Sequence, residues 1–315
     1  MVIRRFRLFD LPLELIYKII GHATCPDDAS TRTKPSSYKT ARRLARSCTF
    51  LFRSTMPYLL RTIVLTSDRD LALFLASYRR QKEGRIASVR LAVNYQIHVR
   101  RVWFNNITDP TMALGASNVV DYKTLYEIIR ESSSLAMNVF SMHIISSGLV
   151  SRVARPDIDW FCSHITFEGD CLRWNGLTSS HAGQIFLRKI THLCLWVPYH
   201  DLAEMVKVPV AHPSPTWIKN IPFRCMPNLR HLAFPLLVNN GNANSPRPSY
   251  KEMLIYTVPY GQSSTIVGQW ASHPKFVDFG QRVQLRVIPR VDPRKTAWSV
   301  GNVLPETERV WSFFQ

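Results

Sequence analysis

The chain has 315 residues, of which 46% are hydrophobic and 20% charged, a composition typical of a globular protein and inconsistent with wholesale disorder. Its formal net charge at pH 7 is +18, and residues 1–101 hold 20 Lys and Arg against 7 Asp and Glu. This basic first third predicts an acidic partner, which is a nucleic acid, an acidic protein face or an anionic membrane surface. Since no apolar run approaches the roughly 20 residues that a membrane helix needs, we predict no membrane span.

The spacing of the cysteines and the first residues of the chain indicate the cellular compartment. No two of the six cysteines form a C-x-x-C pair, and the chain is long for a disulfide scaffold, so we predict reduced thiols. The basic start of the chain resembles that of a signal peptide, but charges interrupt the apolar stretch that would follow, namely Asp10, Glu14 and Lys18. We therefore predict a cytoplasmic or nuclear protein.

The first predicted helix begins near Asp10 and runs to Ala23. Pro12 suits the first turn of a helix, and Glu14 lies near the positive end of the helix dipole. Apolar residues recur along this segment at helical spacing, and they are Leu11, Leu15, Ile16, Ile19, Ile20 and Ala23. The pattern predicts an amphipathic helix.

Two more helices are predicted before residue 61. Turn-forming and charged residues predict a loop over residues 24–37. A second helix then begins at Ser36 or Ser37, since either is a good N-cap. The third covers residues 50–60 and is bent or restarted at Pro57.

Beyond these helices, short strand-like runs alternate with helical or loop segments. The predicted strands cover residues 62–65, 88–93, 140–145, 163–167, 191–196, 229–234, 254–258 and 283–288. Predicted helices cover residues 70–82, 122–131 and 306–313. A strand, a connector and another strand is the pattern of stacked β/α units. The chain is therefore expected to be an α/β protein, with a three-helix unit over residues 8–65 and an irregular β/α solenoid over residues 66–315.

One extended pattern resembles a known family. It reads Leu11-Pro12-x-Glu14-Leu15-x-x-x-Ile19-Ile20, then Leu44-Ala45-x-x-Cys48, then Met56-Pro57-x-Leu59-Leu60-x-Thr62-Ile63-Val64-Leu65. This string resembles the F-box, especially that of F-box-like proteins abundant in mushroom-forming fungi. The later segments resemble the degenerate leucine-rich repeats that often follow an F-box. In that family the F-box helices dock on the adaptor subunit of an SCF-type cullin–RING ubiquitin ligase, and the repeats hold the protein substrate.

The resemblance implies a set of adaptor-binding residues, which are Leu11, Pro12, Leu15, Ile19, Leu44, Cys48, Leu51 and Pro57. Leu11, Leu15 and Ile19 would fill a groove on the partner, in the helix-in-groove mode. The alternative is that these side chains face the core of the chain itself.

The chain departs from the family at two points. The loop over residues 24–37 lengthens the first connection, and Cys48-Thr49-Phe50-Leu51 stands where the family often has Cys-Arg-x-aromatic. An F-box-like protein that no longer binds the adaptor is therefore a second hypothesis.

Basic clusters support a third hypothesis, a scaffold that associates with nucleic acid. The clusters lie at residues 4–7, 42–46, 79–82 and 100–101, with Phe6, Phe9, Tyr38 and Trp103 among or near them. Because they belong to different predicted elements and no recognition-helix or zinc-finger motif accompanies them, we favour a solvated charged surface.

Catalytic and metal-binding motifs are sparse. The sequence has no glycine-rich phosphate loop, no G-x-S-x-G and no H-E-x-x-H. The spacings Cys162-x-His164 and His192-x-Cys194 lack the two sets of ligand pairs that zinc sites show. We therefore predict a non-catalytic protein without metal or cofactor. The F-box resemblance implies two partners, a ligase adaptor and an unknown protein substrate.

Overall fold

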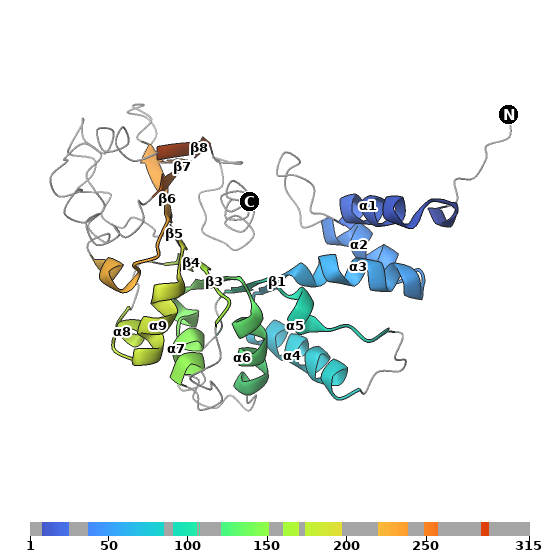
Figure 1. Cartoon of the computed structure of the whole chain (residues 1–315), viewed down its shortest axis with the longest axis horizontal. Helices are drawn as coiled ribbons and strands as arrows, with labels where there is room; N and C mark the ends of the chain where they lie inside the picture. The colour runs from blue at the N-terminus through green and yellow to red at the C-terminus, as the bar shows by residue number, and fades with distance from the viewer. Residues whose placement is uncertain are drawn as a thin grey trace.

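The computed structural model describes residues 8–24, 37–84, 91–105, 107, 121–150, 160–169, 174–196, 220–238, 249–257 and 285–289, and the statements below concern these residues. They form a mixed α/β structure. A sheet with six parallel strands occupies the middle of the chain, and three helices precede it (Figure 1). The predicted α/β class is confirmed.

The helices that precede the sheet follow a short 3-10 turn. Their bounds are η1 Leu8–Asp10, α1 Leu13–Thr24, α2 Ser37–Ala45 and α3 Thr49–Arg61. All three predicted helices are confirmed. Pro57 lies inside α3, which continues past it to Arg61 as one helix. Ile16, Ile20 and Leu51 are at most 7% exposed and pack together, and we call this cluster the N-terminal core.

Eight strands follow one another in the sheet in the order in which they occur in the chain. Their bounds are β1 Thr62–Leu65, β2 Arg101–Phe104, β3 Ser134–Asn138, β4 His164–Glu168, β5 His192–Trp196, β6 His231–Val238, β7 Ser249–Thr257 and β8 Leu285–Pro289. Strands β1 to β6 pair in parallel, whereas β7 and β8 are antiparallel to their neighbours. Parallel neighbours require crossover connections, which the next helices supply.

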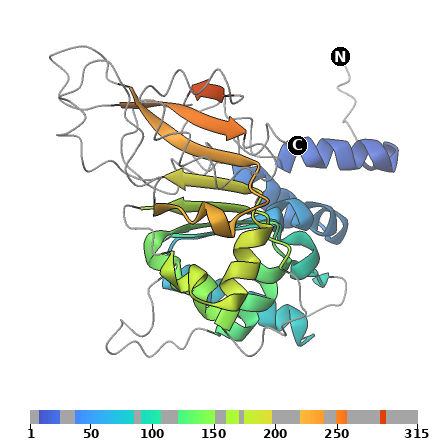
Figure 2. The same cartoon turned by 60° about the vertical axis from the view of Figure 1, so that its left-hand side comes forward.

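The crossover helices lie on one face of the sheet, below the strands in Figures 1 and 2. Their bounds are α4 Asp68–Lys82, α5 Tyr95–His98, α6 Tyr122–Glu131, α7 His143–Val150, α8 Asn175–Thr178 and α9 His181–Lys189, with 3-10 turns η3 Val139–Ser141 and η5 Phe223–Cys225. Side-chain oxygens cap several of them: Ser67 caps α4, Asp121 caps α6 and Ser180 caps α9. Each cap accepts a backbone N–H that the first helical turn leaves unpaired.

The main core lies between these helices and the sheet. Strand residues that the parallel register aligns contribute one row to it, and they are Val102, Leu135, Ile165, Leu193 and Leu232, each at most 2% exposed. Because side chains alternate between the two faces of a strand, the residues just before and after this row lie on the other face.

Several predicted strands are confirmed and others are wrong. The runs near β1, β4, β5, β6, β7 and β8 were predicted, whereas β2 and β3 were missed. Residues 140–145 were predicted as a strand but belong to η3 and α7, because Ile144 and Ile145 pack into the main core from a helix. Residues 91–93 form no strand, and residues 88–90 lie outside the described residues, as does the helix predicted at 306–313.

Helix α3 takes part in both cores. Leu51, near its beginning, belongs to the N-terminal core, while Leu60, near its end, is 6% exposed and belongs to the main core. Strand β1 begins at Thr62, directly after the helix ends at Arg61. The predicted division of the chain at residue 65 stays a prediction, and it would cut just beyond this continuous helix and strand.

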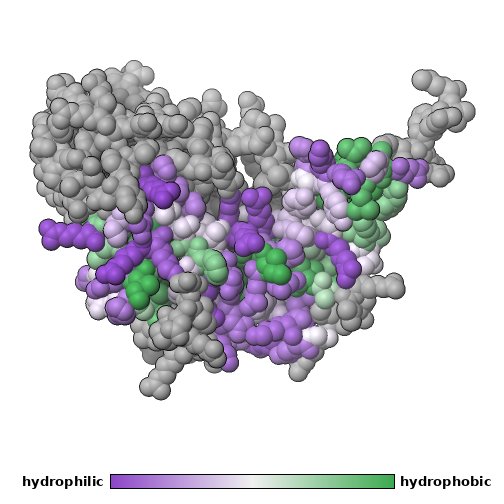
Figure 3. Space-filling model, in the orientation of Figure 1, coloured by the Kyte–Doolittle hydropathy of each residue, from purple (hydrophilic) through white to green (hydrophobic). Residues whose placement is uncertain are grey.

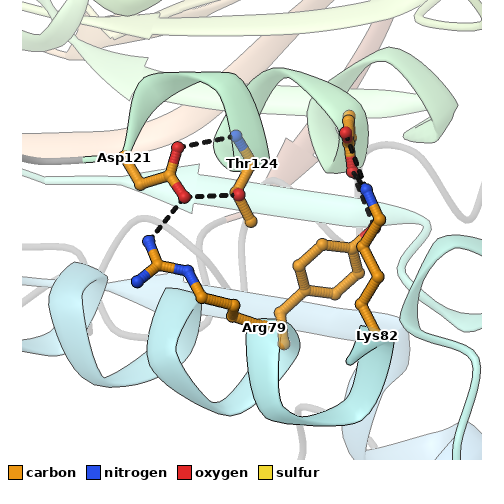
Figure 4. A network of polar contacts seen from close by, with 6 residues as sticks. Arg79, Lys82, Asp121 and Thr124 are labelled. Carbon is orange, nitrogen blue, oxygen red and sulfur yellow. Dashed lines mark hydrogen bonds and ion pairs between the residues drawn. The ribbon is translucent and has the colours of Figure 1, made fainter. Parts of the chain in front are cut away.

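Polar contacts tie α4 to α6 on the outer side of the helical layer (Figure 4). Asp121 accepts hydrogen bonds from the backbone N–H and the hydroxyl of Thr124, and it pairs with Arg79 of α4 at 2.5 Å. Lys82 reaches Glu127 at 2.7 Å, and the Tyr78 hydroxyl donates to the same carboxylate at 3.2 Å. These contacts fix the two helices relative to each other.

Candidate protein-docking surface on the N-terminal helices

Helix α1 divides its apolar residues between the N-terminal core and solvent. Ile16 and Ile20 are 4% and 1% exposed, whereas Leu15 and Ile19 are 45% and 41% exposed. At about 100° per residue, Leu15 and Ile19 lie together on one flank of the buried Ile16–Ile20 stripe. We call Leu15 and Ile19 the leucine–isoleucine flank.

The remaining predicted residues of α1 lie at its start. Pro12 is exposed, and its carbonyl accepts the N–H groups of Leu15 and Ile16 in the first helical turn. Leu11 is half-buried and packs against the N-terminal core. Leu11 therefore contributes to the stability of the helical unit, while Leu15 and Ile19 are the exposed apolar residues of the predicted set on α1.

The predicted residues on α2 and α3 differ in their surroundings. Leu44 is half-buried against the N-terminal core, and Leu51 is buried inside it. Cys48 is exposed, and its sulfur accepts the backbone N–H of Leu51 at 3.5 Å, so it caps α3. Pro57 is half-buried, in the half of α3 that approaches the main core. The structure thus brings Leu11, Leu44 and Leu51 together as support, and their binding role stays a prediction.

A second exposed apolar flank on α1 was not predicted. Leu13 and Tyr17 are 52% and 43% exposed, and Phe9, in the preceding 3-10 turn, is 60% exposed. The rings of Phe9 and Tyr17 both contact Phe50 of α3, with centroids 5.7 and 6.1 Å apart. We call these four residues the aromatic flank. The spacing of Leu13 and Tyr17, four residues apart, was the sequence signal that could have revealed it.

Hydrophobic surface gathers over the part of α1 nearest the N-terminus, at the upper right of Figure 3. Between the two flanks, the outermost side of α1 carries Glu14 and Lys18, both exposed. The apolar surface therefore consists of two strips that border a buried stripe. A partner groove would cover one strip or both.

The N-terminal helical unit carries exposed positive charge. Arg42 and Arg43 of α2 are exposed, as are Arg46 in the turn after it and Lys18 of α1. Asp10 and Glu14 are the acidic residues among the described positions from 8 to 61. The helical unit that carries the apolar surface is therefore basic, and its charge would attract a partner with an acidic surface.

Among the described residues, members of the other basic clusters and their aromatic neighbour are engaged within the fold. Arg79 and Lys82 are paired with carboxylates of α6, and Trp103 is only 2% exposed, so its ring is not available to stack on a base. The cluster at residues 4–7 lies outside the described residues.

Buried thiols and acids in the sheet are poor candidates for nucleophilic or metal chemistry. Burial raises the pKa of the Cys162 thiol to about 12 and also raises the pKa of the Cys194 thiol, so both stay protonated at neutral pH. Burial likewise raises the pKa of the Glu168 carboxyl. In the part of the chain that the structure describes, no group of three or more His, Cys, Asp or Glu side chains is placed to hold a metal ion.

The last two observations concern membrane-spanning helices and similarity to known proteins. None of the described helices combines the length and the apolar character needed to cross a membrane. Comparisons with protein-family models, with curated proteins and with solved structures find no match.

Proposed function

We propose that the protein is a non-catalytic substrate receptor of an SCF-type cullin–RING ubiquitin ligase. Its N-terminal helices would form an F-box-like unit that binds the adaptor subunit. The sheet and its crossover helices would form an irregular solenoid, similar to leucine-rich repeats, that recruits a protein substrate. The proposal combines the F-box-like string at residues 11–65 with the surface that α1 presents.

The observation that carries the proposal is the exposure of Leu15 and Ile19 on a helix that packs against its own core through Ile16 and Ile20. A helix that served only its own core would turn its larger apolar residues inward, as α1 does with Ile16 and Ile20. Two large aliphatic side chains on one flank instead favour docking into a groove. These are residues that the F-box resemblance assigns to the adaptor.

The sheet topology supports the substrate-binding half of the proposal. Parallel strands that follow chain order, with the crossover helices on one face, are typical of solenoids built from stacked β/α units. In such folds each unit contacts mainly its neighbours, and the stack offers an extended surface for a partner protein.

Binding to the purified adaptor tests the proposal. We expect the wild-type chain to co-elute with the adaptor in size-exclusion chromatography. The double variant Leu15→Asp/Ile19→Asp should bind at least roughly 100-fold more weakly, because each buried apolar anchor is worth about 2 kcal/mol or more. Both positions are exposed, so the variant should keep the circular dichroism spectrum of the wild type.

Two control variants sharpen this experiment. Leu73→Asp changes a leucine of α4 that is 61% exposed and far along the chain from α1, and it should leave adaptor affinity unchanged. Leu13→Asp tests the aromatic flank separately. A folded wild-type chain that does not bind the adaptor would refute the proposal and favour an F-box-like protein that has lost adaptor binding.

A basic scaffold for nucleic acid is the alternative candidate, because Arg42 and Arg43 of α2 and Arg46 in the turn after it are all exposed. Such a scaffold should bind oligonucleotides at low salt, with an affinity that falls steeply as ionic strength rises. Absence of oligonucleotide binding at low salt would eliminate it.

A further inference from the structure

Three histidines begin three neighbouring strands of the sheet. His164, His192 and His231 are the first residues of β4, β5 and β6, and the parallel register pairs them directly, His164 with His192 and His192 with His231. The next residue of each strand faces the main core. The three imidazoles therefore lie in one row on the sheet face opposite the crossover helices. We call them the histidine row.

The rings of the histidine row are stacked along the sheet. The centroids of His164 and His192 are 4.0 Å apart with an interplanar angle of 18°, and those of His192 and His231 are 4.6 Å apart at 32°. Hydroxyl groups hold two of the rings at Nδ1: Ser163 Oγ shares a hydrogen bond with His164 at 2.9 Å, and Thr191 Oγ1 shares one with His192 at 2.8 Å. Close stacking suits neutral imidazoles and opposes charge on any of them.

The charged neighbours of the row in the described strands are cationic, while the buried Cys194 thiol on the same face of β5 stays protonated because burial raises its pKa. Arg101 of β2 occupies the same register row, with Ser134 of β3 between it and His164. Arg230 directly precedes His231. On the same face of β4 the described acid is Glu168, four residues further along the strand, or roughly 13 Å at about 3.3 Å per residue. A proton added to the row would therefore meet positive charge from both sides.

We propose that the histidine row makes the fold acid-labile, holding the first residues of β4, β5 and β6 together only while its imidazoles are neutral. Protonation of His192 places a cation between two stacked rings and near Arg230. The repulsion is relieved when this end of the sheet opens and the ring reaches water. Loss of the row loosens the pairing of the last three parallel strands, β4, β5 and β6.

The sign of the effect follows from the histidine ionisation. Burial, together with His164, His231 and Arg230, lowers the pKa of His192 to about 3, and burial followed by the Arg101 charge lowers the pKa of His164. The unfolded chain, with histidine pKa values of about 6.5, therefore binds protons before the folded chain does. Stability is fully present above this value and is lost as the pH falls below it. For His192 alone, the unfolding constant should rise roughly 20-fold between pH 7 and pH 5.

Urea unfolding of the full chain at pH 7 and pH 5 tests the proposal. The variant is His192→Asn, whose amide lies near the position of Nδ1 and can keep the bond to Thr191. The matched control is His181→Asn, at an exposed position at the start of α9. We expect the ratio of unfolding constants between the two pH values to be roughly 20-fold smaller in His192→Asn than in the wild type. The control should behave as the wild type does.

Equal acid sensitivity of the wild type and His192→Asn would overturn the proposal. If the variant fails to fold, imidazole C2–H resonances of the wild-type chain provide an independent reading, with His164→Asn and His231→Asn used for assignment. The His192 resonance should not titrate between pH 8 and pH 5. A titration midpoint near pH 6.5 would overturn the proposal equally.

Discussion

At the scale of single residues, adjacent positions of α1 have opposite surroundings. Ile16 is buried against Leu51, while Leu15 beside it is 45% exposed. The sequence placed both on one apolar side of a helix, because periodicity identifies an amphipathic helix but not which of several apolar residues its neighbours cover. The packing of α3, which comes later in the chain, determines that Ile16 is covered and Leu15 is not. Candidate binding residues in such a helix therefore emerge only when the tertiary contacts are known.

Gly183 shows how tightly one residue of the helical layer is constrained. A Cβ atom built at this buried position would lie 2.1 Å from the carbonyl oxygen of Leu177, so backbone would have to move. We expect Gly183→Ala to lower the free energy of unfolding by about 2–3 kcal/mol, as overpacked core positions do.

Gly176→Ala is a suitable comparison for Gly183→Ala in urea unfolding. The added methyl group would meet the tip of the Ser146 side chain, which can rotate away. We expect a much smaller loss in this variant. Equal losses would mean that the close approach to Leu177 is not the limiting contact.

At the scale of elements, the cap of α6 shows how a local signal and a long-range contact combine. Asp121 caps the helix through Thr124, and Arg79 of α4 reaches the same carboxylate. Burial raises the pKa of Asp121, but the hydrogen bonds from Thr124 and Arg79 outweigh it and leave the pKa below its usual value. The carboxylate therefore stabilises the fold above pH 4, and this contribution is lost as the pH falls through the lowered pKa.

Replacing Asp121 by Ala should remove this contribution. We expect the free energy of unfolding at pH 7 to fall by about 1 kcal/mol, which is typical of a lost N-cap, and the loss to shrink as the pH falls below 4. Arg79→Ala should cost less, because the arginine side chain is 51% exposed and exposed ion pairs contribute under about 1 kcal/mol. Urea titrations at pH 7 and pH 3 measure both effects. A larger loss in Arg79→Ala would contradict the dominance of the cap.

Elements with local signals were predictable from the sequence. The bounds of α6 and β1 agree with the prediction, since a cap or a β-branched run marks each of them. Strands β2 and β3 carry only four and five residues, and their strand character comes from pairing within the sheet. The histidine row could not be predicted from the sequence, because the three rings are brought together only by the strand register of three segments that are distant in the chain.

At the scale of the whole molecule, the shared helix α3 makes the helical unit and the sheet depend on each other. Leu60 is buried in the main core, and Met56 packs against that core from the same helix. Cutting the chain after the predicted unit would expose these side chains to water. The F-box-like resemblance describes a sequence unit that the packing does not separate cleanly.

We therefore expect a fragment of residues 1–66 to unfold without a cooperative transition, although α1, α2 and α3 are folded in the full chain. The reason is that a unit of this size buries too little apolar surface alone and has lost the contacts of Leu60. Thermal melts followed by circular dichroism compare the fragment with the full chain. A sharp transition in the fragment would show that the N-terminal core is sufficient.

The direct passage from Arg61 at the end of α3 to Thr62 at the start of β1 has a geometric consequence. No loop separates the two elements. A partner that binds α1 is therefore held in a defined orientation relative to the sheet. In the proposed ligase complex, a protein substrate bound to the strands would be held in an orientation set by the angle between α3 and β1. Inserting a few glycines between Arg61 and Thr62 would make this orientation variable without changing α1 or the strands.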